Sequence, residues 1–133
     1  MVQMNTSRKD ILVVEDEPTI ARICAITLNA EGFQTEIAVN GRIALDMLKR
    51  KEYVLCLIDI KTPEMSGIEL YRHIEEECPG VKSKVIFTTG DVMSENVKEL
   101  LEKTKRFYLP KPFTPEELRT IVRIASGQCF SQV

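Results

Sequence analysis

Short apolar runs alternate with amphipathic stretches along most of this chain of 133 residues, and that alternation limits the possible folds more than any other feature. The apolar runs predict strands at 10–14, 34–39, 54–58, 84–89 and 106–109. Those at 10–14, 54–58 and 84–89 are continuous, which is typical of strands buried on both faces of a parallel sheet. The run at 34–39 alternates and is expected nearer an edge.

The stretches between these runs have helical spacing and clear helix starts. Val97, Leu100 and Leu101 follow the spacing of one helix face, and Ser66 with Glu69 fits a capping box. We expect helices at 18–31, 41–50, 67–77, 94–104 and 115–126. Strands that alternate with helices in this way predict an α/β fold: a doubly wound, five-stranded parallel sheet with five helices and flavodoxin-like connections.

Length and composition fit one such domain. We expect it at 10–126, between a flexible N-terminal tail at 1–9 and a C-terminal tail at 127–133. The net charge of −2, with both signs mixed along the chain, disfavours direct binding of nucleic acid, which needs a basic stripe. The absence of a membrane-length apolar run, of a secretory signal and of Cys-x-x-Cys pairs predicts a cytoplasmic protein without a zinc site or membrane contact.

Charged and hydroxyl residues stand at the ends of several predicted strands. In an open parallel α/β sheet, ligands bind at the carboxyl ends of the strands, so these residues are the candidate site. They are Glu15, Asp16, Glu17, Asp59, Thr88, Thr89, Gly90, Asp91 and Lys111. Each alone is explained most simply as a solvated loop residue, but the arrival of all of them at one edge is much less probable by chance.

This set of side chains points to phosphoryl chemistry. Carboxylates from two strands make a hard oxygen site that suits Mg²⁺, and a carboxylate can attack phosphorus to form an aspartyl phosphate. A metal ion and a lysine neutralise the charge on a transferring phosphoryl group, while a threonine hydroxyl and backbone N–H groups bind its oxygens. The sequence contains neither Gly-x-Gly-x-x-Gly nor Gly-x-x-x-x-Gly-Lys, the two glycine motifs of nucleotide sites. The predicted site therefore needs no bound nucleotide.

Four stretches, in the right order and spacing, resemble the response-regulator receiver domain of two-component signalling. They lie at 11–18, 57–67, 85–90 and 109–113, and the resemblance runs from residue 10 to about 126. It implies that Asp59 is the phosphoacceptor. It also implies that Mg²⁺ is bound by Asp59, by Asp16, by Glu15 directly or through water, and by the backbone carbonyl of Lys61.

The resemblance assigns the remaining positions as well. Thr89, which directly precedes the small Gly90, matches the switch hydroxyl of the family. Lys111 matches the lysine that reaches the acceptor carboxylate or the phosphoryl group, and the peptide bond between Lys111 and Pro112 is expected to be cis. Tyr108 matches the aromatic switch position.

Two features depart from the commonest pattern or vary among relatives. Glu15 replaces the more frequent aspartate and keeps its charge. Lys61 and Asp91 occupy positions at which relatives tune their autodephosphorylation. We expect these opposite charges to pair across the mouth of the site, to hinder an attacking water and so to slow hydrolysis.

The function implied is a phosphorelay switch rather than an enzyme, beyond assistance to its own phosphorylation and dephosphorylation. The expected donor is the phosphohistidine of a sensor histidine kinase or a histidine phosphotransfer protein. The expected surface for a downstream protein comprises 94–104, 106–109 and 115–126, in a monomer or a phosphorylation-dependent dimer.

Two alternatives are an interaction module that works without phosphorylation and a phosphohydrolase of the haloacid-dehalogenase type. The phosphohydrolase alternative requires a second acid two residues after the nucleophile, a position that Lys61 occupies here. No output domain is recognised after residue 126, so we expect a stand-alone receiver or a fragment of a larger protein. The stretches 87–94 and 109–113 also resemble receivers of hybrid histidine kinases, although only by family analogy.

Overall fold

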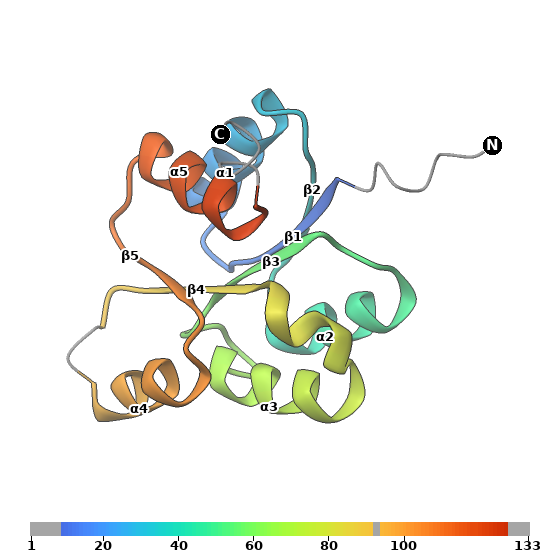
Figure 1. The fold of residues 1–133 in the computed structure, drawn as a ribbon, viewed down its shortest axis with the longest axis vertical. Coiled ribbons are helices and arrows are strands. Elements are labelled where there is room, and N and C mark those ends of the chain that lie inside the picture. The colour runs from blue at the N-terminus through green and yellow to red at the C-terminus, as the bar shows by residue number, and fades with distance from the viewer. Residues whose placement is uncertain (1–8, 92–93, 128–133) are drawn as a thin grey trace.

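A five-stranded parallel sheet forms the centre of the molecule (Figure 1). The structure is a computed structural model that describes residues 9–91 and 94–127, so most of the two predicted tails lies outside the described residues. The strands are β1 (Asp10–Val14), β2 (Gln34–Ala38), β3 (Leu55–Asp59), β4 (Val85–Thr89) and β5 (Phe107–Pro110). Their order across the sheet is β2-β1-β3-β4-β5, which confirms the predicted doubly wound topology.

Helices cover both faces of the sheet. They are α1 (Pro18–Ala30), α2 (Gly41–Arg50), α3 (Gly67–Glu77), α4 (Glu95–Thr104) and α5 (Pro115–Ala125). Figure 1 shows α1 and α5 together on one face and α2, α3 and α4 on the other. Among the described residues, no helix combines the length and apolarity needed to cross a lipid bilayer.

One short element was not predicted. The 3₁₀ segment η2 (Pro79–Lys84) connects α3 to β4, and the Val81 N–H donates to the Cys78 carbonyl at 2.9 Å. Pro79 fixes the backbone at the first position of η2. None of the side chains of η2 is buried. A single tight turn of this kind has no apolar periodicity, which is why the sequence pattern does not reveal it.

The apolar strands divide their side chains between two cores. Along β3, Leu55 and Leu57 pack in the layer of α1 and α5, whereas Cys56 and Ile58 pack in the layer of α2, α3 and α4. Successive side chains of a strand point to opposite faces. The last residue of β3, Asp59, therefore lies on the same face of the strand as Leu55 and Leu57.

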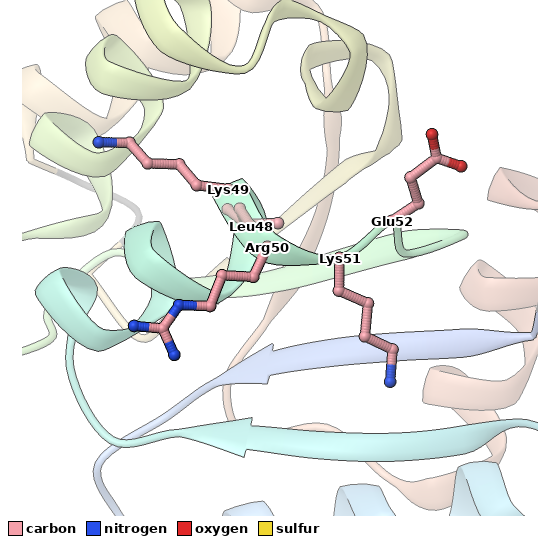
Figure 2. A pocket seen from close by; sticks show the side chains of 5 residues that line it. All are labelled: Leu48, Lys49, Arg50, Lys51 and Glu52. Carbon is pink, nitrogen blue, oxygen red and sulfur yellow. The ribbon is translucent and has the colours of Figure 1, made fainter.

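A polar cluster connects the residue after α2 to the edge strand β2 and to its neighbour β1. The Lys51 ammonium pairs with Glu36 and with Asp10, the latter at 3.2 Å, and the Tyr53 hydroxyl donates to Glu36 at 2.6 Å. Figure 2 shows the Lys51 side chain directed toward β1 and β2, away from Lys49. These contacts join the segment before β3 to the first residue of β1.

This cluster predicts a dependence of stability on pH. Hydrogen bonds from Lys51 and Tyr53 lower the pKa of Glu36. A carboxyl whose pKa is lowered by folding contributes stability that is present above its unfolded pKa and is lost as the pH falls through the folded value. We therefore expect the free energy of unfolding to fall more steeply below about pH 5 in wild type than in Glu36→Gln. Urea unfolding at several pH values measures this, and parallel curves would contradict it.

Candidate functional site

Three carboxylates meet at the carboxyl edge of the sheet. Glu15 and Asp16 follow β1, Asp59 ends β3, and one oxygen from each lies within 4.8 Å of the others. They come together because β1 and β3 are parallel neighbours in which Val14 lies opposite Ile58. Glu15 and Asp59 are only 3% and 4% exposed, whereas Asp16 is exposed to solvent. The structure thus gathers the three acids expected to form a metal site.

Lys111 supplies the positive charge for this acidic group. Its Nζ lies 2.9 Å from Glu15 Oε1 and 2.9 Å from Asp59 Oδ2. The lysine follows β5 directly, and its backbone N–H donates to the Thr89 carbonyl at 3.0 Å. The peptide bond between Lys111 and Pro112 is cis, as expected. Two buried carboxylates are costly without a partner, so this ammonium is what permits their burial.

The pKa values of these groups have identifiable causes. Burial raises the pKa of Glu15, and the negative charge of Asp59 adds to that effect, while the Lys111 hydrogen bond opposes it. Burial alone would lower the pKa of Lys111, but hydrogen bonds to Asp59 and Glu15 outweigh that effect and raise it. Lys111 therefore stays protonated at neutral pH and keeps its charge between the two carboxylates.

The loop after β3 holds the second oxygen of Asp59. The Lys61 N–H donates to Asp59 Oδ1 at 3.1 Å, so both carboxylate oxygens have a partner. The Lys61 ammonium extends to Asp91, where Nζ and Oδ2 are 3.2 Å apart. The Lys61 side chain is largely exposed and that of Asp91 partly so, and the pair therefore adds little to stability. It does place opposite charges of the β3–α3 and β4–α4 loops in contact.

Thr89 and Tyr108 are linked through the end of β4. Thr89 is buried, and its hydroxyl accepts a hydrogen bond from the Asp91 N–H at 3.2 Å. The half-buried Tyr108 on β5 donates its hydroxyl to the Thr89 carbonyl at 3.2 Å. A Cβ added at Gly90 would lie 3.8 Å from the Lys111 carbonyl, an ordinary contact, so an alanine would also fit there.

Two other strand-end residues take no direct part in the acidic group. Glu17 donates only its backbone N–H, to Glu15 Oε2 at 3.1 Å, and its side chain is exposed. The buried Thr88 hydroxyl has no hydrogen-bond partner among the described residues. Sequence reasoning missed Thr62, whose hydroxyl donates to the Met65 carbonyl at 2.8 Å and folds the loop after Asp59. No periodicity or motif distinguishes Thr62 from an ordinary loop residue.

The donor set fits Mg²⁺. This ion prefers hard oxygen ligands and keeps several waters, so it needs one or two carboxylates with access to solvent. The exposed Asp16 beside the buried Asp59 provides that combination. The clustered negative charge of Glu15, Asp16 and Asp59 exceeds what the single ammonium of Lys111 neutralises, which leaves charge for a divalent cation.

The charge balance predicts how stability responds to loss of the lysine. We expect Lys111→Met to lower the free energy of unfolding by about 1–3 kcal/mol, because Glu15 and Asp59 lose their buried partner. Adding Mg²⁺ should restore part of the loss, since the ion brings positive charge to the same carboxylates. Urea unfolding with and without Mg²⁺ measures both effects.

The matched control is Lys49→Met. Lys49 pairs with Glu77 at 2.6 Å on the surface, where an ion pair contributes little, so this change should cost much less stability than Lys111→Met in either condition. If Lys111→Met were as stable as Lys49→Met, or indifferent to Mg²⁺, Lys111 would not be the partner on which burial of the acids depends.

Comparisons with known proteins agree with this geometry. The family model of the response regulator receiver domain matches residues 11–123. The DNA-binding response regulator MtrA of Mycolicibacterium smegmatis is 35% identical over 120 residues, 90% of this chain and 51% of that protein. This chain therefore spans about half the length of that relative.

Solved structures show the same likeness. A CheY-like receiver domain protein of Methanospirillum hungatei matches 96% of this chain and 100% of its own, with a TM-score of 0.82 and 28% identity. The receiver domain of a Pseudomonas aeruginosa sensor histidine kinase, crystallised with a magnesium ion in its active site cleft, matches 91% and 99%, with a TM-score of 0.80 and 25% identity. The chain belongs to the response regulator receiver domains of two-component signalling systems.

Proposed function

We propose that this domain is a phosphorylation switch in which Asp59 accepts a phosphoryl group. The donor is the phosphohistidine of a sensor histidine kinase or a histidine phosphotransfer protein. The observation that carries this proposal is the setting of Asp59, buried at the end of β3 between the Lys111 ammonium and the carboxylates of Glu15 and Asp16. The magnesium ion in the cleft of the Pseudomonas aeruginosa receiver supports Mg²⁺ as the cofactor.

The chemistry follows from the residues that surround Asp59. Asp16, Asp59, the Lys61 carbonyl and Glu15, directly or through water, would hold Mg²⁺, which would supply positive charge to the phosphoryl oxygens. An Asp59 oxygen attacks phosphorus, the new O–P bond forms, and the N–P bond breaks with its electron pair returning to the donor imidazole. Lys111 stays bound to Glu15 and turns its remaining donors to the phosphoryl oxygens.

Phosphorylation then changes the hydrogen bonds of Thr89. The new group adds a charge of roughly −1.5 to −2 and three strong acceptor oxygens. Among the described residues the Thr89 hydroxyl accepts a bond from the Asp91 N–H and donates none, so it could donate to a phosphoryl oxygen. Because Tyr108 is bonded to the Thr89 carbonyl, a shift of Thr89 changes the position of Tyr108. The surface formed by α4, β5 and α5 changes with it, and we propose that a downstream protein binds there.

The proposal covers this domain alone. Relatives named DNA-binding response regulators match over 51% of their length. We assign no nucleic-acid contact to the described residues, because the charge around the site is predominantly acidic. The phosphohydrolase alternative loses support, because Lys61 stands where that class needs an acid and its ammonium pairs with Asp91.

Phosphate analogues test the proposal directly. Wild type should form a complex with beryllofluoride and Mg²⁺ that shifts the backbone NMR signals of Thr89, Gly90 and Tyr108. Acetyl phosphate should add one phosphoryl group to the protein, visible as an increase in intact mass. Asp59→Asn should show neither response, because an amide oxygen neither attacks phosphorus nor binds the metal with a full charge.

Asp46→Asn is the matched control, since Asp46 lies on the exposed surface of α2 and should respond as wild type does. An unresponsive wild type would favour an interaction module that works without phosphorylation. Equal responses in wild type and Asp59→Asn would place the acceptor elsewhere, and either result overturns the proposal. Continuous release of phosphate from excess acetyl phosphate, at a rate typical of an enzyme, would instead favour a phosphohydrolase.

We expect the contact between Lys61 and Asp91 to lengthen the lifetime of the aspartyl phosphate. We expect it to hinder the approach of water, so that Lys61→Gln combined with Asp91→Asn shortens the lifetime. The contact is exposed and worth at most about 1 kcal/mol, which corresponds to a change of up to about fivefold. The loss of mass after removal of acetyl phosphate measures the lifetime. Lys49→Gln, which breaks another surface pair, should leave it unchanged, and a double variant with the wild-type lifetime would contradict the prediction.

A further inference from the structure

The turn between β2 and α2 contributes none of the residues assigned to the site, yet it contacts two of the loops that adjoin it, those after β1 and after β3. On one side, the Ala38 carbonyl accepts a hydrogen bond from the Glu15 N–H at 2.9 Å. On the other side, Gly41 lies against Met65 of the β3–α3 loop. A Cβ added at Gly41 would be 2.3 Å from the Met65 carbonyl oxygen and 2.9 Å from Met65 Cβ, closer than side chains approach one another.

This contact is what requires glycine at position 41. The positive-φ glycines of the described chain are Gly32 and Gly127, so the backbone conformation of Gly41 is open to other residues. Gly41 is also the first residue of α2, whose start is capped by Asn40 through the Ile43 N–H at 2.8 Å. Helix propensity would favour alanine over glycine at position 41. The close approach of Met65 is therefore the feature that excludes a side chain there.

The Met65 carbonyl is in turn a fixed point of the loop after Asp59. It accepts the hydrogen bond of the buried Thr62 hydroxyl at 2.8 Å, and the Met65 N–H donates to the Pro63 carbonyl at 2.7 Å. The loop closes where the Gly67 N–H donates to the Ile60 carbonyl at 2.8 Å. A displacement of Met65 by a side chain at position 41 would therefore move Thr62 as well.

Thr62 is the immediate neighbour of Lys61, whose N–H donates to Asp59 Oδ1 at 3.1 Å. We infer that Gly41 is a positioning residue for the metal site. Because Gly41 has no side chain, the β2–α2 turn can pack directly against the β3–α3 loop. That contact fixes the loop, which orients Asp59 and positions the Lys61 carbonyl. This inference rests on the proposed function, because it assumes that Mg²⁺ binds at Asp59 and Lys61. Residues that orient metal ligands commonly change metal affinity 10- to 100-fold when they are altered.

Two variants test this packing contact, one on each side of the Met65 carbonyl. Gly41→Ala pushes on the Met65 carbonyl, and Thr62→Val removes the hydrogen bond that this carbonyl accepts. We expect each to weaken Mg²⁺ binding to the full chain by about tenfold, measured by calorimetry. The double variant should lose less than the product of the two effects, because both act through Met65. Saturating Mg²⁺ should restore the full extent of beryllofluoride binding.

Matched controls separate this effect from a general loss of stability. A Cβ at Gly80 meets nothing within 4 Å, so Gly80→Ala should bind Mg²⁺ as wild type does. Thr35→Val removes a comparable hydroxyl bond, to Asn29 at 3.0 Å, near the opposite end of the sheet, and should also leave Mg²⁺ affinity unchanged. Thermal unfolding without Mg²⁺ reports the structural cost of every variant.

The outcomes are distinct. Wild-type Mg²⁺ affinity in Gly41→Ala and Thr62→Val would overturn the inference and leave the proposed function intact. A loss of beryllofluoride binding that saturating Mg²⁺ does not restore would also overturn it, because the effect would then be structural. If Gly41→Ala does not fold, the Mg²⁺ affinity of Thr62→Val is compared with that of Thr35→Val, and equal affinities would overturn the inference. Absence of Mg²⁺ binding in wild type and in both controls would overturn the proposed function and this inference together.

Discussion

The Lys111 ammonium, 2.9 Å from both Glu15 and Asp59, is the interaction on which the site depends. Two carboxylates buried side by side repel each other, and burial disfavours their charge as well. The lysine offsets part of both penalties, but it follows β5, while the acids follow β1 and end β3. Because β4 lies between β3 and β5, the lysine crosses the end of β4, where its N–H binds the Thr89 carbonyl. The charged site thus forms only when the four strands β1, β3, β4 and β5 are in place.

The same arrangement joins the acidic group to the surface that we propose as the output. Lys111 and Tyr108 both make hydrogen bonds to the Thr89 carbonyl, one from the site and one from the face of β5. A change of charge at Asp59 alters the partner of Lys111 and the partner of the Thr89 hydroxyl at once. In the proposed function the strand ends supply the reacting groups, while turns such as the one at Gly41 hold the loops that present them.

The fold was predictable because burial on both faces produces unbroken apolar runs, and all five strands and five helices agree with their expected bounds to within one residue. That single residue matters at Asp59, which ends β3 rather than following it, so that the pleat determines the face its carboxylate enters. The contact of Lys111 with Asp59 followed from the family resemblance. Its contact with Glu15 depends on side-chain reach across the sheet, and the approach of Gly41 to Met65 joins two distant loops. Neither contact produces a periodic pattern, so neither could be predicted from the sequence.

The central claim is that the surplus negative charge at the carboxyl edge is a binding site for a divalent cation beside Asp59, the proposed phosphoacceptor. A crystal structure of wild type grown with Mn²⁺ tests it most directly, because this ion accepts the same oxygen ligands as Mg²⁺ and is located by its anomalous scattering. We predict one anomalous peak bound by the carboxylates of Asp16 and Asp59 and by the Lys61 carbonyl. A peak elsewhere with none at these residues, or no peak at saturating Mn²⁺, would contradict the account.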